Sequence, residues 1–157
     1  MSNKVKPIPE GYHSVTPYLT VSDGKAALDF YQRAFDAKVV MQMPGENGKV
    51  MHADILLGNS HVMLSDEFPD YGALSPKTLG GRSGTVMLYV EDVDAVVASA
   101  VAAGGVLERP VADQFYGDRV GMVRDPFGHG WHISTHIEDV PDSEMEKRMR
   151  EWESKNS

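Results

Sequence analysis

The chain has 157 residues, of which 41% are hydrophobic, contains no cysteine and carries a formal net charge of −8. This length suffices for one domain with a substantial core, and the absence of thiols excludes disulfides, thiolate catalysis and cysteine-bound zinc. The acidic balance argues against a surface for nucleic acid or an anionic membrane, and no apolar run approaches the roughly 20 residues that span a bilayer.

The first half of the chain predicts one βαβββ unit after an irregular, proline-bearing lead-in over residues 1–13. Asp23 is positioned to cap the helix, and 44–48 and Gly58-Asn59 have the composition of tight turns. The predicted elements are a strand over 14–21, a helix over 24–35 and strands over 39–43, 50–57 and 60–65.

Residues 66–84 interrupt this pattern. They are rich in glycine, proline and serine and show no clear hydrophobic period. A connector of this length is either a linker or a functional loop. We expect a loop over the mouth of a cavity, because the two halves must pack together to bury their sheets.

The second half predicts the same order of elements. Asp92 is the expected helix cap, and Gly104-Gly105 is expected to end the helix in the left-handed conformation that favours glycine. The elements are a strand over 85–90, a helix over 93–103 and strands over 106–110, 119–124 and 131–135.

A further helix is expected near the C-terminus, over 143–154. Ser143 and Glu146 have the spacing of a capping box. An apolar stripe predicts that this helix packs on the body or on a partner subunit; it consists of Met145, Met149 and Trp152.

The two halves are an internal repeat. A shift of 69 positions places 16–23 on 85–92 and 62–65 on 131–134. The repeat predicts an α+β fold of two tandem βαβββ modules that form a curved mixed sheet around a groove. The predicted organisation is a lead-in over 1–13, a single domain over 14–140 with modules 14–65 and 85–136, and a C-terminal helix and tail over 141–157.

Strand alternation sorts side chains into a face that meets the helix and an open face. The open set includes Tyr18, Thr20, His52, Asp54, His61, Met63, Met87, Tyr89, Arg119, Gly121, Val123, His132 and Ser134. In the 119–124 strand, Val120 and Met122 are assigned to the helix side. Open faces with apolar and polar side chains are typical of a small-molecule groove, which the small residues Gly121 and Gly130 favour. The alternative is a barrel filled by these side chains.

Together with the repeat, several local strings resemble the vicinal oxygen chelate superfamily, which contains glyoxalases, bleomycin-resistance proteins and extradiol dioxygenases. The likeness covers about residues 12–140 and is greatest to the PhnB-like branch. The strings are 17–19 (PYL), 30–35 (FYQRAF), 51–54 (MHAD), 65–68 (SDEF), 89–94 (YVEDVD) and 125–129 (DPFGH).

The resemblance implies four metal-ligand positions on the open face, which fall on Thr16, Met63, Thr85 and His132. Only His132 is a conventional ligand, since hydroxyls and a thioether do not replace carboxylates and imidazoles around zinc, iron or manganese. We therefore expect no metal and no other cofactor, which disfavours glyoxalase I and dioxygenase chemistry. A displaced metal site built from His52, His61 and His132 is the alternative.

Residues 113–119 form a second polar cluster. The pseudo-symmetry matches Arg119 with His52, so we expect its guanidinium on the open face, where it can grip an oxyanion. Tyr116 and Tyr89 can stack on a flat ligand. The structural alternative for Arg119 is a salt bridge with Asp118, Asp54 or Asp66. The carboxylate of the 125–128 segment is interpreted as part of a turn.

These observations favour a cytoplasmic homodimer that binds and sequesters a small organic molecule, aromatic or anionic in character. The homodimer follows from the resemblance and the C-terminal helix, and the location from the lack of cysteine and of a signal-peptide pattern. The expected ligand-binding residues are Thr16, Tyr18, His52, Met63, Thr85, Tyr89, Tyr116, Arg119 and His132.

Two other classes of function stay open. One is an enzyme, either a lyase or isomerase with His52 or His132 as general base, or a metal enzyme with relocated ligands. The other is a structural or regulatory partner protein, which only the additional helix supports.

Overall fold

The computed structural model describes residues 5–157, which form two compact units. The first unit extends to Arg82 and the second begins at Ser83. The boundary therefore lies within the connector over 66–84, and each unit is described by itself.

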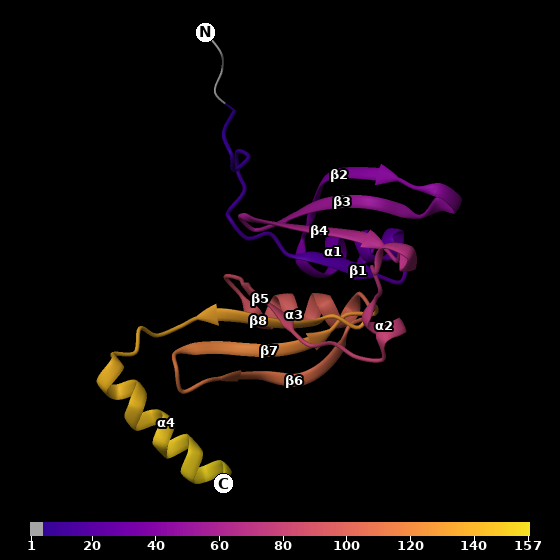
Figure 1. Ribbon diagram of the computed structural model, residues 1–157. Helices are drawn as coiled ribbons and strands as arrows, with labels where there is room; N and C mark the ends of the chain where they lie inside the picture. Colours follow the sequence, from indigo (N-terminus) through magenta and orange to yellow (C-terminus); the bar gives the residue numbers. More distant parts are fainter. Residues whose placement is uncertain (1–4) are drawn as a thin grey trace. The chain divides into compact units, whose positions relative to one another are not determined.

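The first unit is a four-stranded sheet with one long helix (Figure 1). The strand order is β1-β4-β3-β2, with β1 parallel to β4 and the other pairs antiparallel. The elements are β1 (Tyr18–Val21), α1 (Gly24–Phe35), β2 (Lys38–Pro44), β3 (Val50–Leu57) and β4 (Ser60–Asp66).

The second unit repeats this topology with the order β5-β8-β7-β6. Its elements are β5 (Thr85–Tyr89), α3 (Val93–Ala102), β6 (Val106–Asp113), β7 (Asp118–Arg124), β8 (Gly130–His136) and the C-terminal α4 (Asp142–Asn156). Two βαβββ modules and an additional helix confirm the predicted α+β fold class.

Helices α1 and α3 each cover one face of the sheet in their own unit. Helix α1 contacts β2, β3 and β4, and α3 contacts β6, β7 and β8. The buried apolar strand residues include Ala53, Ile55, Leu57, Val62 and Leu64 in the first unit and Val123, Trp131 and Ile133 in the second. Apolar burial against the helices stabilises each unit, and the opposite face of each sheet is the open face.

The predicted helix boundaries depend on side-chain caps that the structure contains. The carboxylate of Asp23 accepts a hydrogen bond from the Ala26 N–H (3.0 Å), and that of Asp92 accepts one from the Ala95 N–H (3.0 Å). Gly104 follows α3 with φ +117°, a conformation that favours glycine. These three signals are confirmed.

The predicted capping box of the C-terminal helix is wrong. Helix α4 begins at Asp142 with Pro141 as its N-cap, and no side chain caps it. The Pro141 carbonyl accepts from the N–H groups of Glu144 and Met145. Because proline has a φ suited to a helix start, the helix begins earlier than expected and Ser143 lies inside its first turn.

Helix α4 packs on its own unit through part of its surface. The Arg148 guanidinium pairs with Glu138 (2.8 Å), and the Trp152 ring lies 5.9 Å from that of Phe115. Met149 and Trp152 nevertheless stay 43% and 49% exposed. Packing on the body is therefore confirmed in part, and packing on a partner subunit stays a prediction.

Strands β1 and β6 differ most in length from the prediction. Strand β1 begins at Tyr18 rather than at residue 14, although the Pro17 carbonyl accepts from the Met63 N–H (2.9 Å). Strand β6 continues through Pro110 to Asp113. Proline is tolerated there because β6 is an edge strand with a register shift between Arg109 and Ala112.

The connector between the units contains two single-turn helices. They are Pro69–Tyr71 and α2 (Pro76–Leu79). None of the helices among residues 5–157 is long and apolar enough to cross a membrane.

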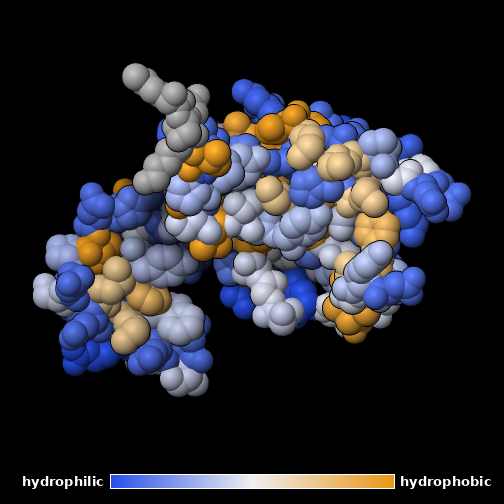
Figure 2. Space-filling view, turned by 45° about the horizontal axis from the view of Figure 1, so that its top comes forward, coloured by the Kyte–Doolittle hydropathy of each residue, from blue (hydrophilic) through white to orange (hydrophobic). Residues whose placement is uncertain are grey.

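Edge strand β2 and the start of β3 carry exposed apolar side chains. They are Val39, Val40, Met41, Met43 and Met51. In Figure 2, apolar areas are interspersed with hydrophilic ones on the face shown. Scattered exposure of this kind is ordinary for a protein surface.

Candidate functional site

The open face of the first sheet carries a row of chemically varied side chains. Tyr18 of β1 is paired with Met63 of β4, which is paired with Asp54 of β3. Because paired residues point to the same side of a sheet, these three side chains share the open face. The predicted alternation of β1, β3 and β4 is therefore confirmed.

Tyr18 and His52 form a pair at this face. The Tyr18 hydroxyl lies 2.8 Å from His52 Nδ1, with ring centroids 5.5 Å apart. Tyr18 is 52% exposed and His52 is half-buried. A ligand can therefore reach a flat phenol and an imidazole whose Nε2 is not used in this hydrogen bond.

A second group is centred on Asp54, which is fully buried. Its carboxylate accepts a hydrogen bond from the Tyr12 hydroxyl and lies 2.8 Å from His61 Nδ1. The Tyr12 ring stacks on His61 at 3.8 Å. The hydrogen bond to Asp54, with burial, raises the pKa of the Tyr12 hydroxyl.

This arrangement fixes the lead-in against the first sheet. Tyr12 precedes β1 in a segment without helix or strand, so no hydrophobic period identified it. Asp54 had the expected open-face orientation, but its burial and its two partners could not be derived from alternation. Both residues were missed as parts of the site.

The open face of the second sheet carries a related network. The Tyr89 hydroxyl donates to Asp118 Oδ2 (2.7 Å), and His136 Nδ1 lies 2.7 Å from Asp118 Oδ1. His136 Nε2 lies 2.8 Å from Asp139. The hydrogen bond to Asp118 raises the pKa of Tyr89, and the bonds to Asp118 and Asp139 raise the pKa of His136.

His132 and Ser134 lie on the open face of β8, the strand between β5 and β7. His132 is paired with Met87 and Met122, and Ser134 with Tyr89 and Val120. Ser134 Oγ is buried without a hydrogen-bond partner among the described residues. An unsatisfied buried hydroxyl is unusual, so this face has unused hydrogen-bonding capacity.

The predicted orientation of Arg119 is wrong. The offset between equivalent residues is 69 for β4 and β8 (Met63 and His132) but 68 for β3 and β7 (Asp54 and Met122). The equivalent of His52 is therefore Val120 rather than Arg119. Because a one-residue offset exchanges the faces of a strand, the whole β7 assignment reverses.

The offset originates in the turn between β7 and β8. Leu57 is paired with Ser60, so Gly58 and Asn59 alone close the first turn. In the second, the Asp125 N–H donates to the His129 carbonyl (2.9 Å), which leaves 126–128 between them. One additional turn residue thus places Arg119, Gly121 and Val123 on the helix side.

Arg119 forms ion pairs with two carboxylates on that side. Its Nε and Nη2 donate to Asp94 of α3 (2.7 and 2.9 Å), and Nη1 donates to Asp113 of β6 (2.8 Å). This hydrogen bonding lowers the pKa of Asp94 and raises that of Arg119. The structural salt bridge is thus found, with partners other than those expected, and its donors are not directed to the open face.

The remaining predicted residues are divided between the open faces and their surroundings. Thr16 lies in the lead-in before β1, and Tyr116 lies in the β6–β7 turn with 36% exposure. Burial, followed by the charge of Asp118, raises the pKa of Tyr116. The predicted residues on the open faces are Tyr18, His52 and Met63 in the first unit and Thr85, Tyr89 and His132 in the second.

The donor set of the implied metal positions does not fit a divalent metal. The first unit contributes Thr16 and Met63, and the second contributes Thr85 and His132. Hydroxyl, thioether and a single imidazole form a poor set for zinc, iron or manganese. Over residues 5–157, no group of three or more His, Asp or Glu side chains is placed to hold a metal ion.

The alternative histidine cluster is not formed within the first unit. His61 is paired with Leu56, which lies four residues from His52 on β3. At a rise of about 3.3 Å per residue, the two imidazoles originate about 13 Å apart along the sheet. Their Nδ1 atoms also have different partners, Asp54 for His61 and Tyr18 for His52.

The 125–129 segment is a turn, as predicted. The Asp125 carboxylate accepts from the N–H groups of Phe127 and His129 (both 2.9 Å) and from Trp131 Nε1 (2.9 Å). Gly128 has φ +94°. Asp125 therefore has a structural role in the turn between β7 and β8.

Comparison with known proteins gives consistent results. A protein-family model described as the Glyoxalase/Bleomycin resistance protein/Dioxygenase superfamily matches residues 11–133. Uncharacterized protein Mb0911c of Mycobacterium bovis is 38% identical over 139 residues, which are 87% of this chain and 91% of the relative. Uncharacterized protein Rv0887c of Mycobacterium tuberculosis has the same identity over 82% of its length.

Solved structures of similar fold include TioX from Micromonospora sp. ML1. It has 28% identity and a TM-score of 0.64 and covers 80% of this chain and 99% of its own. A gene product of Arabidopsis thaliana has 26% identity and a TM-score of 0.62, with 78% and 98% covered. A PhnB protein from Bacillus cereus, at 17% identity and a TM-score of 0.59, covers 78% and 99% and shares the fold.

Proposed function

The chain belongs to the Glyoxalase/Bleomycin resistance protein/Dioxygenase superfamily, and from this premise we propose that it binds a small organic molecule at the open sheet faces without a metal. The observation that carries the proposal is the composition of these faces. Exposed phenol rings lie beside imidazoles and thioethers, with Tyr18 52% and Tyr89 60% exposed. Flat aromatic surface with a few polar groups suits a small-molecule site.

The polar groups of the proposed site are positioned by their neighbours. Tyr18 is hydrogen-bonded to His52, and Tyr89 to the buried Asp118. Side chains held in this way lose little further freedom on binding, which favours affinity. The unpaired hydroxyl of Ser134 adds unused hydrogen-bonding capacity to the second face.

The ligand that these faces favour is aromatic rather than anionic. The guanidinium expected to bind an anion, that of Arg119, instead pairs with Asp94 and Asp113 on the helix side. Asp54 and Asp118 lie beneath the open faces. We therefore propose a molecule with an aromatic ring and hydrogen-bonding groups.

We propose binding without a metal because of the donor chemistry of Thr16, Met63, Thr85 and His132, which suits no divalent transition metal. Metal analysis of protein purified without a histidine tag tests this proposal. A stoichiometric ion would overturn it.

One observation favours an enzyme as the second candidate function. The Tyr18 hydroxyl lies 2.8 Å from His52 Nδ1, and Nε2 takes no part in this hydrogen bond. An imidazole on the open face is a suitable general base for a lyase or isomerase. Recovery of the bound compound distinguishes the two functions, because sequestration returns it unchanged.

The test of binding uses a panel of phenolic and other aromatic compounds, followed by calorimetry. We expect one or more to bind with micromolar affinity and to be recovered unchanged. Tyr18→Ala or Tyr89→Ala is expected to weaken that binding about tenfold, since an aromatic contact contributes about 0.5–1.5 kcal/mol beyond its buried area. Consumption of the compound that His52→Ala abolishes would instead support catalysis.

The location and assembly complete the proposal. We propose a cytoplasmic homodimer, since the chain lacks cysteine and α4 carries exposed Met149 and Trp152. Light scattering at micromolar concentration tests the dimer. A monomer under these conditions would contradict it.

A further inference from the structure

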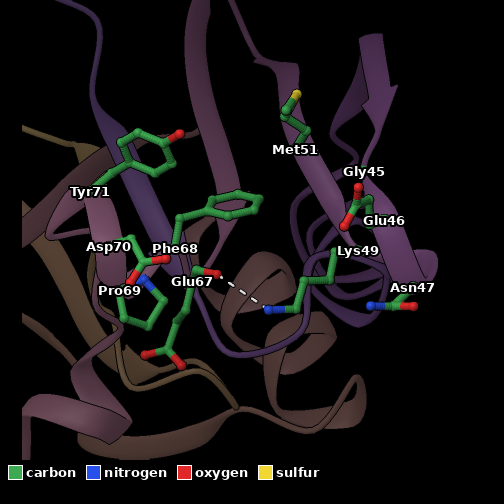
Figure 3. A pocket seen from close by; sticks show the side chains of 10 residues that line it. All are labelled: Gly45, Glu46, Asn47, Lys49, Met51, Glu67, Phe68, Pro69, Asp70 and Tyr71. Atoms are coloured by element: carbon green, nitrogen blue, oxygen red, sulfur yellow. Dashed lines mark hydrogen bonds between the residues drawn. The ribbon is translucent and has the colours of Figure 1, made fainter.

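A cavity of about 410 Å³ lies in the first unit, between the β2–β3 hairpin and the segment that follows β4 (Figure 3). None of the predicted ligand-binding residues lines it. The residues that matter chemically are Glu46, Lys49, Met51, Phe68, Asp70 and Tyr71. Its volume is within the range of small-molecule sites.

Backbone hydrogen bonds hold both walls of the cavity. On one side, the Gly45 N–H donates to the Lys49 carbonyl (2.8 Å) and closes the hairpin. On the other, Phe68 and Ala73 exchange two backbone hydrogen bonds (3.0 and 3.2 Å), and the Tyr71 N–H donates to the Phe68 carbonyl (3.0 Å). The cavity is therefore preformed, which reduces the entropic cost of binding.

The Phe68 ring forms the floor of this cavity. Lys49 Nζ lies 5.7 Å from its centroid and donates to the Glu67 carbonyl (3.4 Å). In Figure 3 the ring lies between Lys49 on one side and Met51 and Tyr71 on the other. One ring face is thus covered by a cation, and the other is directed toward Met51 and Tyr71, which are 54% and 88% exposed.

The charges around the ring are predominantly negative. The lining contains the carboxylates of Glu46 and Asp70 and the ammonium of Lys49. The Glu67 carboxylate accepts a hydrogen bond from the Ser75 N–H (2.7 Å) and is directed away from the Phe68 ring in Figure 3. Hydrogen bonds from Thr78 and Ser75 lower the pKa of Glu67, so it stays ionised. The ammonium of Lys49 is engaged with a carbonyl and a ring, whereas Glu46 and Asp70 have no ion pair among the described residues.

We propose that this cavity binds a small aromatic ammonium ion. The ligand ring stacks on the free face of Phe68 between Met51 and Tyr71, and its ammonium group lies near Glu46 or Asp70. Stacking and sulfur–aromatic contact favour the ring, and the surplus of carboxylates favours the positive charge. An aromatic anion would meet the carboxylates of Glu46 and Asp70 and one ammonium that already has partners.

Three probes of similar size and different charge test the proposal. They are 2-phenylethylammonium, 2-phenylethanol and 3-phenylpropionate, titrated into the full chain while backbone amide NMR shifts of residues 45–51 and 67–73 are followed. We expect the cation to bind about fivefold or more tightly than the alcohol, and the anion to bind weakest. Equal affinity for the three probes, preference for the anion, or absence of shifts in these residues would overturn the proposal.

Charge variants give an independent test at the same site. Glu46→Gln and Asp70→Asn should together weaken binding of the cation about two- to fivefold, the effect of partly exposed charges. Lys49→Gln should strengthen it by a similar factor, because a competing cation is removed. The matched control Glu91→Gln, at an exposed site in the second unit, should change nothing.

Phe68→Leu removes the stacking surface and keeps an apolar side chain, so we expect the cation to bind at least about tenfold more weakly. Binding unaffected by Phe68→Leu, or weakened by Lys49→Gln, would contradict the proposal. Tyr18→Ala serves as the control for the open face and should leave these titrations unchanged. This site and the open-face function can therefore fail separately.

Discussion

Gly121→Ala tests the assignment of β7 faces that excludes Arg119 from the open side. Gly121 lies on β7 opposite Ile133, against α3. A Cβ at this position would lie 2.9 Å from Val111 Cγ2 and 3.0 Å from Val97 Cγ2. Carbon atoms in favourable contact are about 3.5–4.0 Å apart, so alanine requires its neighbours to move.

The expected loss of stability follows from these contacts. Valine side chains are restricted at χ1, so relief requires movement of α3 or β6. Overpacking costs about 1–3 kcal/mol, and alanine regains about 0.4–1 kcal/mol by restricting the unfolded chain. We therefore expect Gly121→Ala to lower the free energy of unfolding by about 1–2 kcal/mol.

The assay is urea denaturation followed by tryptophan fluorescence. Both tryptophans, Trp131 and Trp152, lie in the second unit, so the signal reports on the unit that contains Gly121. Gly84→Ala is the matched control, because no atom lies within 4 Å of its added Cβ and its φ is not positive. If Gly121→Ala were as stable as the wild type or more stable, the residue would face open space and the reasoning would be refuted.

Three further predictions concern Arg119, Asp125 and His136. Arg119→Gln should leave the affinity of an open-face ligand within about twofold in calorimetry, because its ion pairs are on the helix side and partly exposed. Asp125→Ala should lower the free energy of unfolding by about 3 kcal/mol or more, since three donors lose a buried carboxylate; a change within error in urea melts would contradict this. His136 has a raised pKa, so its contribution to stability is complete below about pH 6.5 and is lost as the pH rises through the folded-state pKa. The urea midpoint should therefore fall more between about pH 6 and pH 9 in the wild type than in His136→Gln. An equal fall in the two proteins would contradict a stabilising interaction of His136 with Asp118 and Asp139.

The fold could be predicted because its signals are local and repeated. Asp23 and Asp92 cap α1 and α3 at the expected positions, and alternation assigns the open faces of β1, β3, β4, β5 and β8 correctly. The failure at β7 has a single cause. The apolar character of Val120 and Met122 indicates the helix side, but the additional residue in the 126–128 turn places both on the open face, since strand faces are sensitive to a shift of one residue.

The rest of the site depends on contacts that no period encodes. Tyr12 reaches Asp54 from a segment without regular structure, and the Phe68 cavity joins a hairpin to a connector. Arg119 pairs with Asp94 and Asp113, 25 and 6 residues away. Only the packing of elements brings such groups together, so the sequence identified residue types suited to binding more reliably than their partners.

Native mass spectrometry of freshly purified, untagged protein tests the central claim most directly. The expected spectrum is a dimer that carries a non-covalent organic ligand and no stoichiometric metal, with the ligand lost from Tyr18→Ala or Tyr89→Ala. A stoichiometric divalent cation, or a ligand retained equally by both variants, would contradict binding at metal-free open faces.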